Sequence, residues 1–123
     1  MKQFKNLILF LIITLYGCSV ESKFKNAEQL KNDGKYDLAL KKYSEIINKY
    51  PGSEFSANSQ FIIANIYLYK HKKYEQAKKE YELFLSKYSS DGRIQKANNE
   101  IDRINKILSK FRKWTRKFIK QTI

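Results

Sequence analysis

The sequence is poor in the residues that most active sites and cross-links require. Its 123 residues include one cysteine, Cys18, and one histidine, His71. A single thiol cannot form an internal disulfide, and neither residue has a further cysteine or histidine nearby at metal-ligand spacing. His71 lies in a lysine-rich turn, where we expect it to be solvated. The sequence also contains no glycine-rich phosphate loop and no activated serine. It therefore predicts no enzyme, no cofactor and no metal site.

The chain also lacks an apolar run long enough to cross a bilayer, which needs about 20 residues. Its longest run, Leu7–Tyr16, is about half that length and follows two cations, Lys2 and Lys5. A charged start, a short apolar core and a small residue, here Gly17, are typical of a secretory signal. We therefore expect residues 1–17 to be a signal peptide. A buried core helix is the alternative.

The lone cysteine follows this run directly. The stretch Leu15-Tyr16-Gly17-Cys18 resembles the bacterial lipobox, although Tyr16 is bulkier than the usual occupant of its position. The resemblance implies that Cys18 is acylated and becomes the first residue of the mature protein, followed by a short tether, residues 18–22. Each buried acyl CH₂ contributes about 0.8 kcal/mol, so several chains give durable anchoring. A spare thiol in an ordinary signal peptide is the alternative.

Acidic residues are scarce. There are 12 against 25 lysines and arginines, for a net charge of +13, and none occurs from Arg103 onward. Such a balance ordinarily indicates nucleic-acid binding. An exported protein does not meet the chromosome, so we expect no nucleic-acid partner. Anionic lipid headgroups, cell-wall polymer or an acidic protein face remain, and part of the charge follows from a composition rich in Lys, Asn, Ile and Tyr.

Two segments of the sequence repeat one another. Residues 35–50 and 73–88 are identical at seven of 16 positions, including Tyr36/Tyr74 and Tyr43/Tyr81. The spacing Tyr-x-x-Ala-x-x-x-Tyr places these side chains on one helical face. Breaks at 32–34, 51–52, 71–73 and 89–92 divide the chain into helix–turn–helix units, and Gly34 can adopt the left-handed cap conformation. Two such units are therefore predicted over residues 23–92.

The repeated positions resemble the tetratricopeptide repeat. In the first copy they are Ala27, Leu30, Gly34, Tyr36, Ala39, Tyr43, Ile46 and Pro51, and in the second Phe61, Ala64, Leu68, Tyr74, Ala77, Tyr81 and Phe84. The second copy departs where Asn65 replaces a small residue and Ser89 replaces the proline. The distance between the copies exceeds the family's period of about 34 residues, which implies a longer inter-repeat loop around Pro51–Ala57.

The remaining residues, 93–123, contain no glycine or proline and predict a long amphipathic helix. At the offset that relates the two copies, Ala97 aligns with Ser59, so we expect this helix to begin a third, half-complete repeat that caps the other two. The distal part mixes aromatic and basic residues: Arg112, Lys113, Trp114, Arg116, Lys117, Phe118 and Lys120. It suits an anionic membrane, an acidic partner groove or, alternatively, a solvated end folded onto the repeats.

One predicted helix, residues 59–70, is apolar on nearly every side. Phe61, Ala64 and Leu68 suffice for packing within the repeat, which leaves Ile62, Ile66 and Tyr69 at helical spacing. In tetratricopeptide folds these positions face the concave groove, so we expect a partner-binding stripe. The alternative is that the C-terminal helix covers them.

A lipobox followed at once by such repeats resembles the outer-membrane-assembly lipoprotein family called BamD, over roughly residues 15–110. The resemblance implies a scaffold on the periplasmic face of the outer membrane that binds the periplasmic domains of the BamA barrel subunit, and it allows unfolded outer-membrane proteins as further partners. The family usually has about five repeats, whereas this chain has about two and a half. Another periplasmic adaptor, or a membrane-surface accessory protein, remains open.

Overall fold

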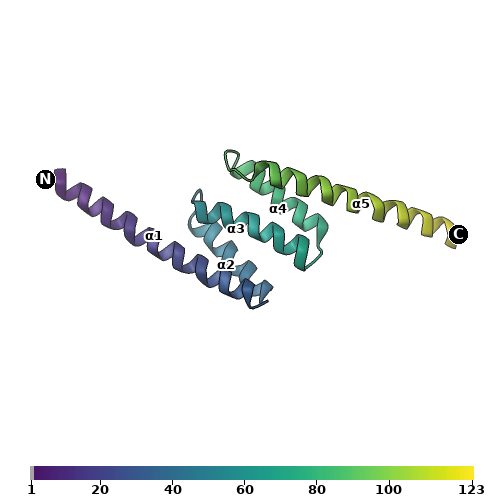
Figure 1. Ribbon diagram of the computed structural model, residues 1–123, viewed down its shortest axis with the longest axis horizontal. Coiled ribbons are helices and arrows are strands. Elements are labelled where there is room, and N and C mark those ends of the chain that lie inside the picture. The colour runs from purple at the N-terminus through teal and green to yellow at the C-terminus, as the bar shows by residue number, and fades with distance from the viewer. Residues whose placement is uncertain (1) are drawn as a thin grey trace. The chain divides into compact units, whose positions relative to one another are not determined.

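The computed structural model describes residues 2–123, without the side chains of residues 13 and 15–18. Every regular element in this part of the chain is a helix (Figure 1). In chain order these are α1 (Lys2–Asn32), α2 (Tyr36–Lys49), α3 (Glu54–Asn65), the π-helical turn η1 (Ile66–Lys70), α4 (Tyr74–Lys87) and α5 (Ile94–Thr122). The predicted all-α fold with a long C-terminal helix is confirmed.

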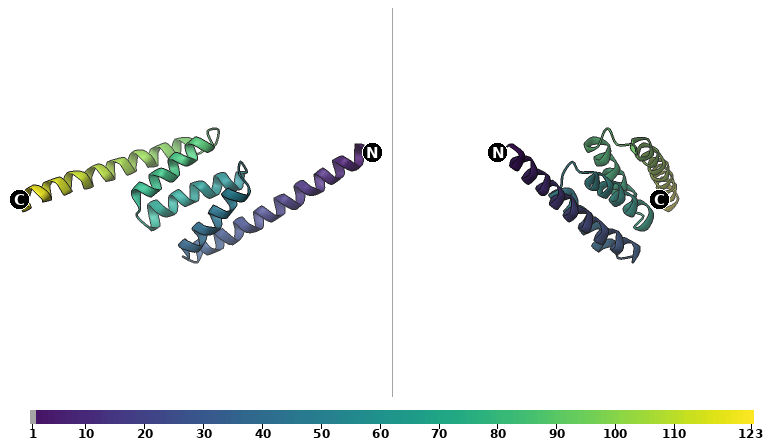
Figure 2. Two further views of the ribbon diagram at one scale, coloured as in Figure 1. Left: turned by 180° about the vertical axis from the view of Figure 1, so that it is seen from behind. Right: turned by 60° about the vertical axis from the view of Figure 1, so that its left-hand side comes forward.

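The helices form two compact units, residues 1–59 and residues 60–123, which divide within α3. In the first unit α1 and α2 lie side by side, and in the second α4 and α5 do so (Figure 2). Short connections reverse the chain between the members of each pair, so the paired helices run antiparallel.

The first unit is built around Tyr43 of α2, which is fully buried. The Phe24 ring of α1 meets Tyr43 edge-on with 5.7 Å between centroids, and the Tyr43 hydroxyl donates a hydrogen bond to Glu28. Ala27 and Ala39 are also fully buried, as expected where two helices approach closely. Aromatic burial and small residues therefore account for this helix pair.

The second unit repeats this arrangement around Tyr81 of α4. Its ring is fully buried, lies edge-on to Phe61 at 5.6 Å, and its hydroxyl donates to Asn65 Oδ1 at 2.5 Å. Burial raises the pKa of Tyr43 and of Tyr81 well above the ordinary value. Both hydroxyls therefore stay protonated and remain donors at any physiological pH.

Arg93 links the start of α5 to this core. Its guanidinium carbon lies 5.2 Å from the Phe61 ring centroid and 5.3 Å from that of Phe84, and Nη2 is 2.8 Å from Asp91 Oδ2. Hydrogen bonds from Arg93 hold the pKa of Asp91 below its ordinary value. The Arg93 guanidinium lies over two rings and pairs with a carboxylate. These contacts fix the loop between α4 and α5.

The sequence offset that aligns the two copies of the repeat is not constant. It has one value for the helices that follow the position of η1 and a shorter value for the helices that precede it. Downstream, α2 and α4 correspond end to end, with Tyr36 matching Tyr74 and Lys49 matching Lys87. Upstream, the offset between matching contacts is one residue shorter, which aligns Ser22, Phe24, Ala27 and Glu28 with Ser59, Phe61, Ala64 and Asn65. The π turn η1 accommodates the extra residue. Asn65 is therefore the counterpart of Glu28, and its interpretation as a missing small residue is wrong.

The expected long loop around Pro51–Ala57 is also wrong. Helix α2 ends at Lys49 and α3 begins at Glu54, while Ala57 lies inside α3 and is buried. The additional length of the repeat is helical, because α3 and η1 contribute 12 and 5 residues.

Helix α5 packs on α4 through its first half. Ala97 and Ile104 are fully buried. Helices α3 and α5 begin at Glu54 and Ile94, which aligns Ala97 with buried Ala57 in the repeat. By their helix starts, Ala97 therefore corresponds to Ala57 and not, as expected, to Ser59, and the third repeat stays a prediction. Residues 109–123 are all exposed.

Helix α1 continues without a break through the predicted tether, residues 18–22. An extended tether is not observed, and five helical residues span about 7.5 Å where an extended chain would span about 17 Å. Within the part of the chain that is described, no helix has both the length and the apolar content needed to span a bilayer.

The turn that precedes α2 and the turn that precedes α4 differ in strain. Gly34 has φ +75° and Lys72, at the same place in the second unit, has φ +54°. A left-handed conformation costs a residue with a Cβ about 1–2 kcal/mol, whereas glycine adopts it freely. We predict that Lys72→Gly raises the free energy of unfolding by about 0.5–1 kcal/mol in urea titrations followed by circular dichroism.

Gly34→Lys is the matched change. No heavy atom lies within 4 Å of a Cβ built at Gly34, so only backbone strain opposes the substitution. It should lower the unfolding free energy by about 1 kcal/mol. Equal stabilities of all three proteins would contradict this assignment of strain.

Candidate interaction site

Among the side chains of α1 that are described, the first contacts with α2 and its end come after Cys18. Val20 is buried, and Ser19 Oγ lies 3.3 Å from the Tyr50 hydroxyl. Upstream, the apolar side chains Phe4, Leu7, Ile8, Leu9, Phe10, Leu11 and Ile12 are 46–74% exposed. The side chain of Cys18 lies outside the described residues, so its acylation stays a prediction.

The predicted stripe on helix 59–70 is only partly at the surface. Ile66 is 3% exposed, Ile62 is half-buried, and Tyr69 is 38% exposed. The expectation of a continuous exposed apolar stripe is therefore wrong at Ile66. The reason is that η1 packs against α4, which turns Ile66 into the core together with Leu68.

Tyr69 is held by α5. Its hydroxyl donates to Glu100 Oε1 at 2.7 Å and accepts from Arg103 Nη1 at 3.0 Å. The Arg103 guanidinium carbon also lies 5.3 Å from the centre of the Tyr69 ring. The C-terminal helix thus contacts this end of the predicted stripe but leaves part of the ring exposed.

The surroundings of Tyr69 favour the neutral form of its phenol. Burial, followed by the hydrogen bond to Glu100, raises the pKa of Tyr69, and Arg103 opposes the shift. The cluster presents a partly exposed tyrosine and a half-exposed arginine, two of the side chains enriched at protein-interface hot spots. Its chemistry fits protein recognition, with Tyr69 and Arg103 as the exposed members. Sequence reasoning missed Glu100 and Arg103, although their spacing from buried Ala97 places both on the edge of the packed face.

The basic amphipathic end has no covering element among the described residues. All seven residues predicted for it are exposed, with Trp114 at 65% and Phe118 at 54%. The Tyr74 ring, at the first residue of α4, lies 6.3 Å from Phe111, so α5 extends beyond its partner from about that point. The alternative in which this end folds onto the repeats is not observed.

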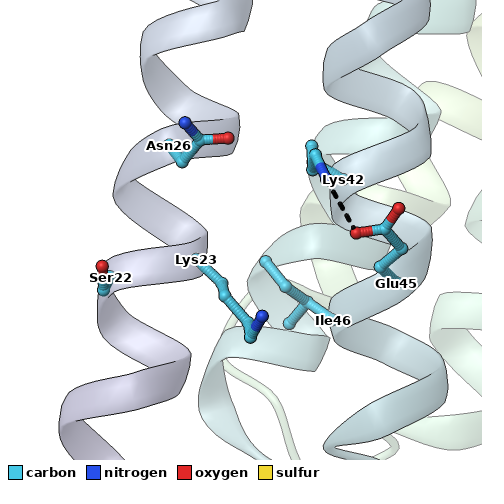
Figure 3. A pocket seen from close by; sticks show the side chains of 6 residues that line it. All are labelled: Ser22, Lys23, Asn26, Lys42, Glu45 and Ile46. Carbon is cyan, nitrogen blue, oxygen red and sulfur yellow. Dashed lines mark hydrogen bonds and ion pairs between the residues drawn. The ribbon is translucent and has the colours of Figure 1, made fainter.

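A polar hollow between α1 and α2 was not predicted. It measures about 300 Å³ and is lined by Ser22, Lys23, Asn26, Lys42, Glu45 and Ile46 (Figure 3). Lys42 and Glu45 lie on the α2 side of this hollow, with Lys42 Nζ 3.1 Å from Glu45 Oε2. The helical spacing of these polar residues was a usable signal, but such spacing is common on solvated helix faces.

His71 is half-buried, and its ring lies 5.9 Å from that of Tyr67. The expectation of a solvated histidine is therefore wrong. In the described part of the chain, no group of three histidine, cysteine, aspartate or glutamate residues could hold a metal ion.

Comparison with known proteins agrees with the helix pairs. A family model described as tetratricopeptide repeat matches residues 21–53 and 58–91, which together exceed half of the chain. The matched segments include Tyr43 and Tyr81 and both turns. No curated protein matches the chain.

Burial at position 66 gives a direct test of the corrected site. Ile66→Glu places a carboxylate in the packed core of the second unit, which should lower the unfolding free energy by more than about 3 kcal/mol. The matched variant Leu38→Glu, at a side chain that is 54% exposed on α2, should change stability by less than about 0.5 kcal/mol. Urea unfolding measures both variants. If the Ile66→Glu protein were as stable as the Leu38→Glu protein, Ile66 would be exposed and the original prediction of an exposed stripe would hold.

Proposed function

The chain belongs to the tetratricopeptide repeat family, and on that premise we propose a specific adaptor role. The protein is a non-catalytic scaffold held at the periplasmic face of the outer membrane by acylated Cys18. It binds the periplasmic part of the barrel-forming subunit of the β-barrel assembly machinery. Tetratricopeptide repeats typically mediate protein–protein contacts, so a protein partner follows from the family alone.

The observation that carries the anchoring part is the position of Cys18 at the edge of the packed helices. Ser19 and Val20 already contact or enter the first unit, whereas the large apolar side chains described between Phe4 and Ile12 are exposed. Removal of residues 1–17 would therefore take away the exposed apolar surface of residues 4–12 and keep Ser19 and Val20. This arrangement supports cleavage before Cys18 and anchoring through its thiol.

The second unit supports the partner-binding part. Tyr69 and Arg103 are brought together from two helices, and both keep exposed surface. An aromatic ring beside an arginine can bury apolar area and also bind a partner carboxylate or backbone carbonyl. These two residues are our candidates for the partner contact, in place of the buried Ile66.

The choice of the barrel-assembly machinery rests on the resemblance to BamD, in which a lipobox precedes the repeats. The same architecture fits an adaptor for cell-wall enzymes, which is the second candidate. The two differ in the partner, so identification of the bound protein separates them.

Acylation can be measured directly. Cells that express the chain should incorporate labelled palmitate into it, and Cys18→Ala should abolish the label. Failure of the intact chain to incorporate label would disprove the anchor without bearing on the repeats.

The partner can be captured by a photoreactive phenylalanine analogue at position 69. Irradiation of intact cells should give an adduct with a large outer-membrane barrel protein. The same analogue at Leu83, which has similar exposure (41%) on α4, should give none. An adduct with a cell-wall enzyme would replace our assignment by the second candidate, and equal adducts at both positions would remove Tyr69 from the contact.

A further inference from the structure

The distal half of α5, residues 109–123, is not used by the adaptor role. We propose that this segment is an interfacial helix that lies on an anionic lipid surface. The proposal goes beyond protein binding and does not depend on acylation of Cys18. It rests on three features of the segment: its apolar stripe, its charge and the absence of a covering element among the described residues.

The apolar stripe of α5 continues past the point where α4 begins. In the packed half it contains Ile104 and Leu108, and it goes on through Phe111, Trp114 and Phe118 at spacings of three and four residues. These three rings are 54–65% exposed, and Ile119 is 51% exposed. The rings of Trp114 and Phe118 stack with centroids 5.5 Å apart, and a hollow of about 410 Å³ is lined by Ile107, Lys110, Phe111 and Trp114. An exposed apolar patch of this kind marks an interaction site.

The remaining circumference of the segment is cationic. It carries Lys110, Arg112, Lys113, Arg116, Lys117 and Lys120 and no acidic residue. In the packed half of α5 the charges are mixed, and Arg103 pairs with Glu100 at 3.4 Å. The helix therefore changes character where it leaves α4, from balanced and packed to cationic and exposed.

These features favour a lipid surface over the other possible occupants. A second copy of the chain would bring six further cations to the same contact, which is unfavourable. An acidic protein groove would cover the apolar side but leave the cations on the opposite side without partners. Anionic headgroups surround an interfacial helix on both flanks, and long lysine and arginine stems can bend toward them while the rings enter the acyl boundary.

The consequence is orientational. The segment is continuous with the part of α5 that packs on α4. Binding of residues 109–123 in the plane of the membrane would therefore fix the angle of the second unit to the surface. Acyl chains on Cys18 alone would not set that angle.

Trp114 allows a local test because it is the only tryptophan. The full chain is mixed with vesicles of phosphatidylglycerol and phosphatidylethanolamine, and with vesicles of phosphatidylcholine alone. We expect the anionic vesicles to shift Trp114 emission to shorter wavelength and to make it accessible to quenchers carried on the lipid chains. The apolar N-terminal residues can also bind vesicles, but they contain no tryptophan and do not move this signal.

Charge is tested by Lys113→Gln/Lys117→Gln/Lys120→Gln. Each cation near an anionic surface contributes about 1 kcal/mol to binding, so the partition coefficient of this triple variant into anionic vesicles should fall about a hundredfold. The control Lys41→Gln/Lys79→Gln/Lys87→Gln removes the same charge from exposed positions on α2 and α4 and should retain nearly all of the emission shift. Circular dichroism verifies that both variants keep the parent helix content.

Several results would overturn the proposal. Vesicles that sediment the chain without shifting Trp114 emission would show binding through the N-terminal residues only. Equal shifts with both kinds of vesicle, or equal losses in the two triple variants, would remove the electrostatic contribution. A shift that follows protein concentration in the absence of lipid would assign the stripe to a second copy.

Discussion

The buried tyrosine hydroxyl in each helix pair is the constraint on which both units depend. Tyr43 and Tyr81 are fully buried, and a buried hydroxyl without a partner costs about 1–3 kcal/mol. Each finds its acceptor on the preceding helix, at Glu28 and Asn65. Although burial of Glu28 opposes its ionisation, hydrogen bonds from Lys31 and Tyr43 outweigh that effect and keep its pKa low. One short polar contact thus sets the register of two helices whose other contacts are apolar and tolerant of sliding.

This constraint explains why the π turn and the positive φ of the second unit lie at the end of its leading helix. Phe61, Ala64 and Asn65 must stay in register with Tyr81, so an extra residue is accommodated only after them. The π turn at residues 66–70 is that place, and the positive φ of Lys72 follows immediately. Deviations are therefore confined to the end of the helix, where fewer contacts depend on them.

Much of the fold could be predicted from the sequence because it follows from local periodicity. The bounds of α2 and α4, the turn at Gly34 and the length of α5 all come from spacing and turn residues. The π turn could not be predicted, since a single inserted residue leaves no signal when one fixed offset is applied. The burial of Ile66 and the contact of Tyr69 with Arg103 were also missed, because they depend on how η1 sits against α4 and α5. Exposure of the distal part of α5 was one of the open alternatives, and helix packing decided it.

The change of offset within the second repeat also decides how the two copies are to be aligned. Alignment of segment 20–28 with segment 57–65 pairs three identical residues, Ser22/Ser59, Phe24/Phe61 and Ala27/Ala64. In the register of α2 and α4, segment 20–27 aligns instead with segment 58–65, and no identity is left. The likeness between the copies therefore extends over both helices of the repeat, and an alignment of the copies requires a one-residue gap near the end of the leading helix.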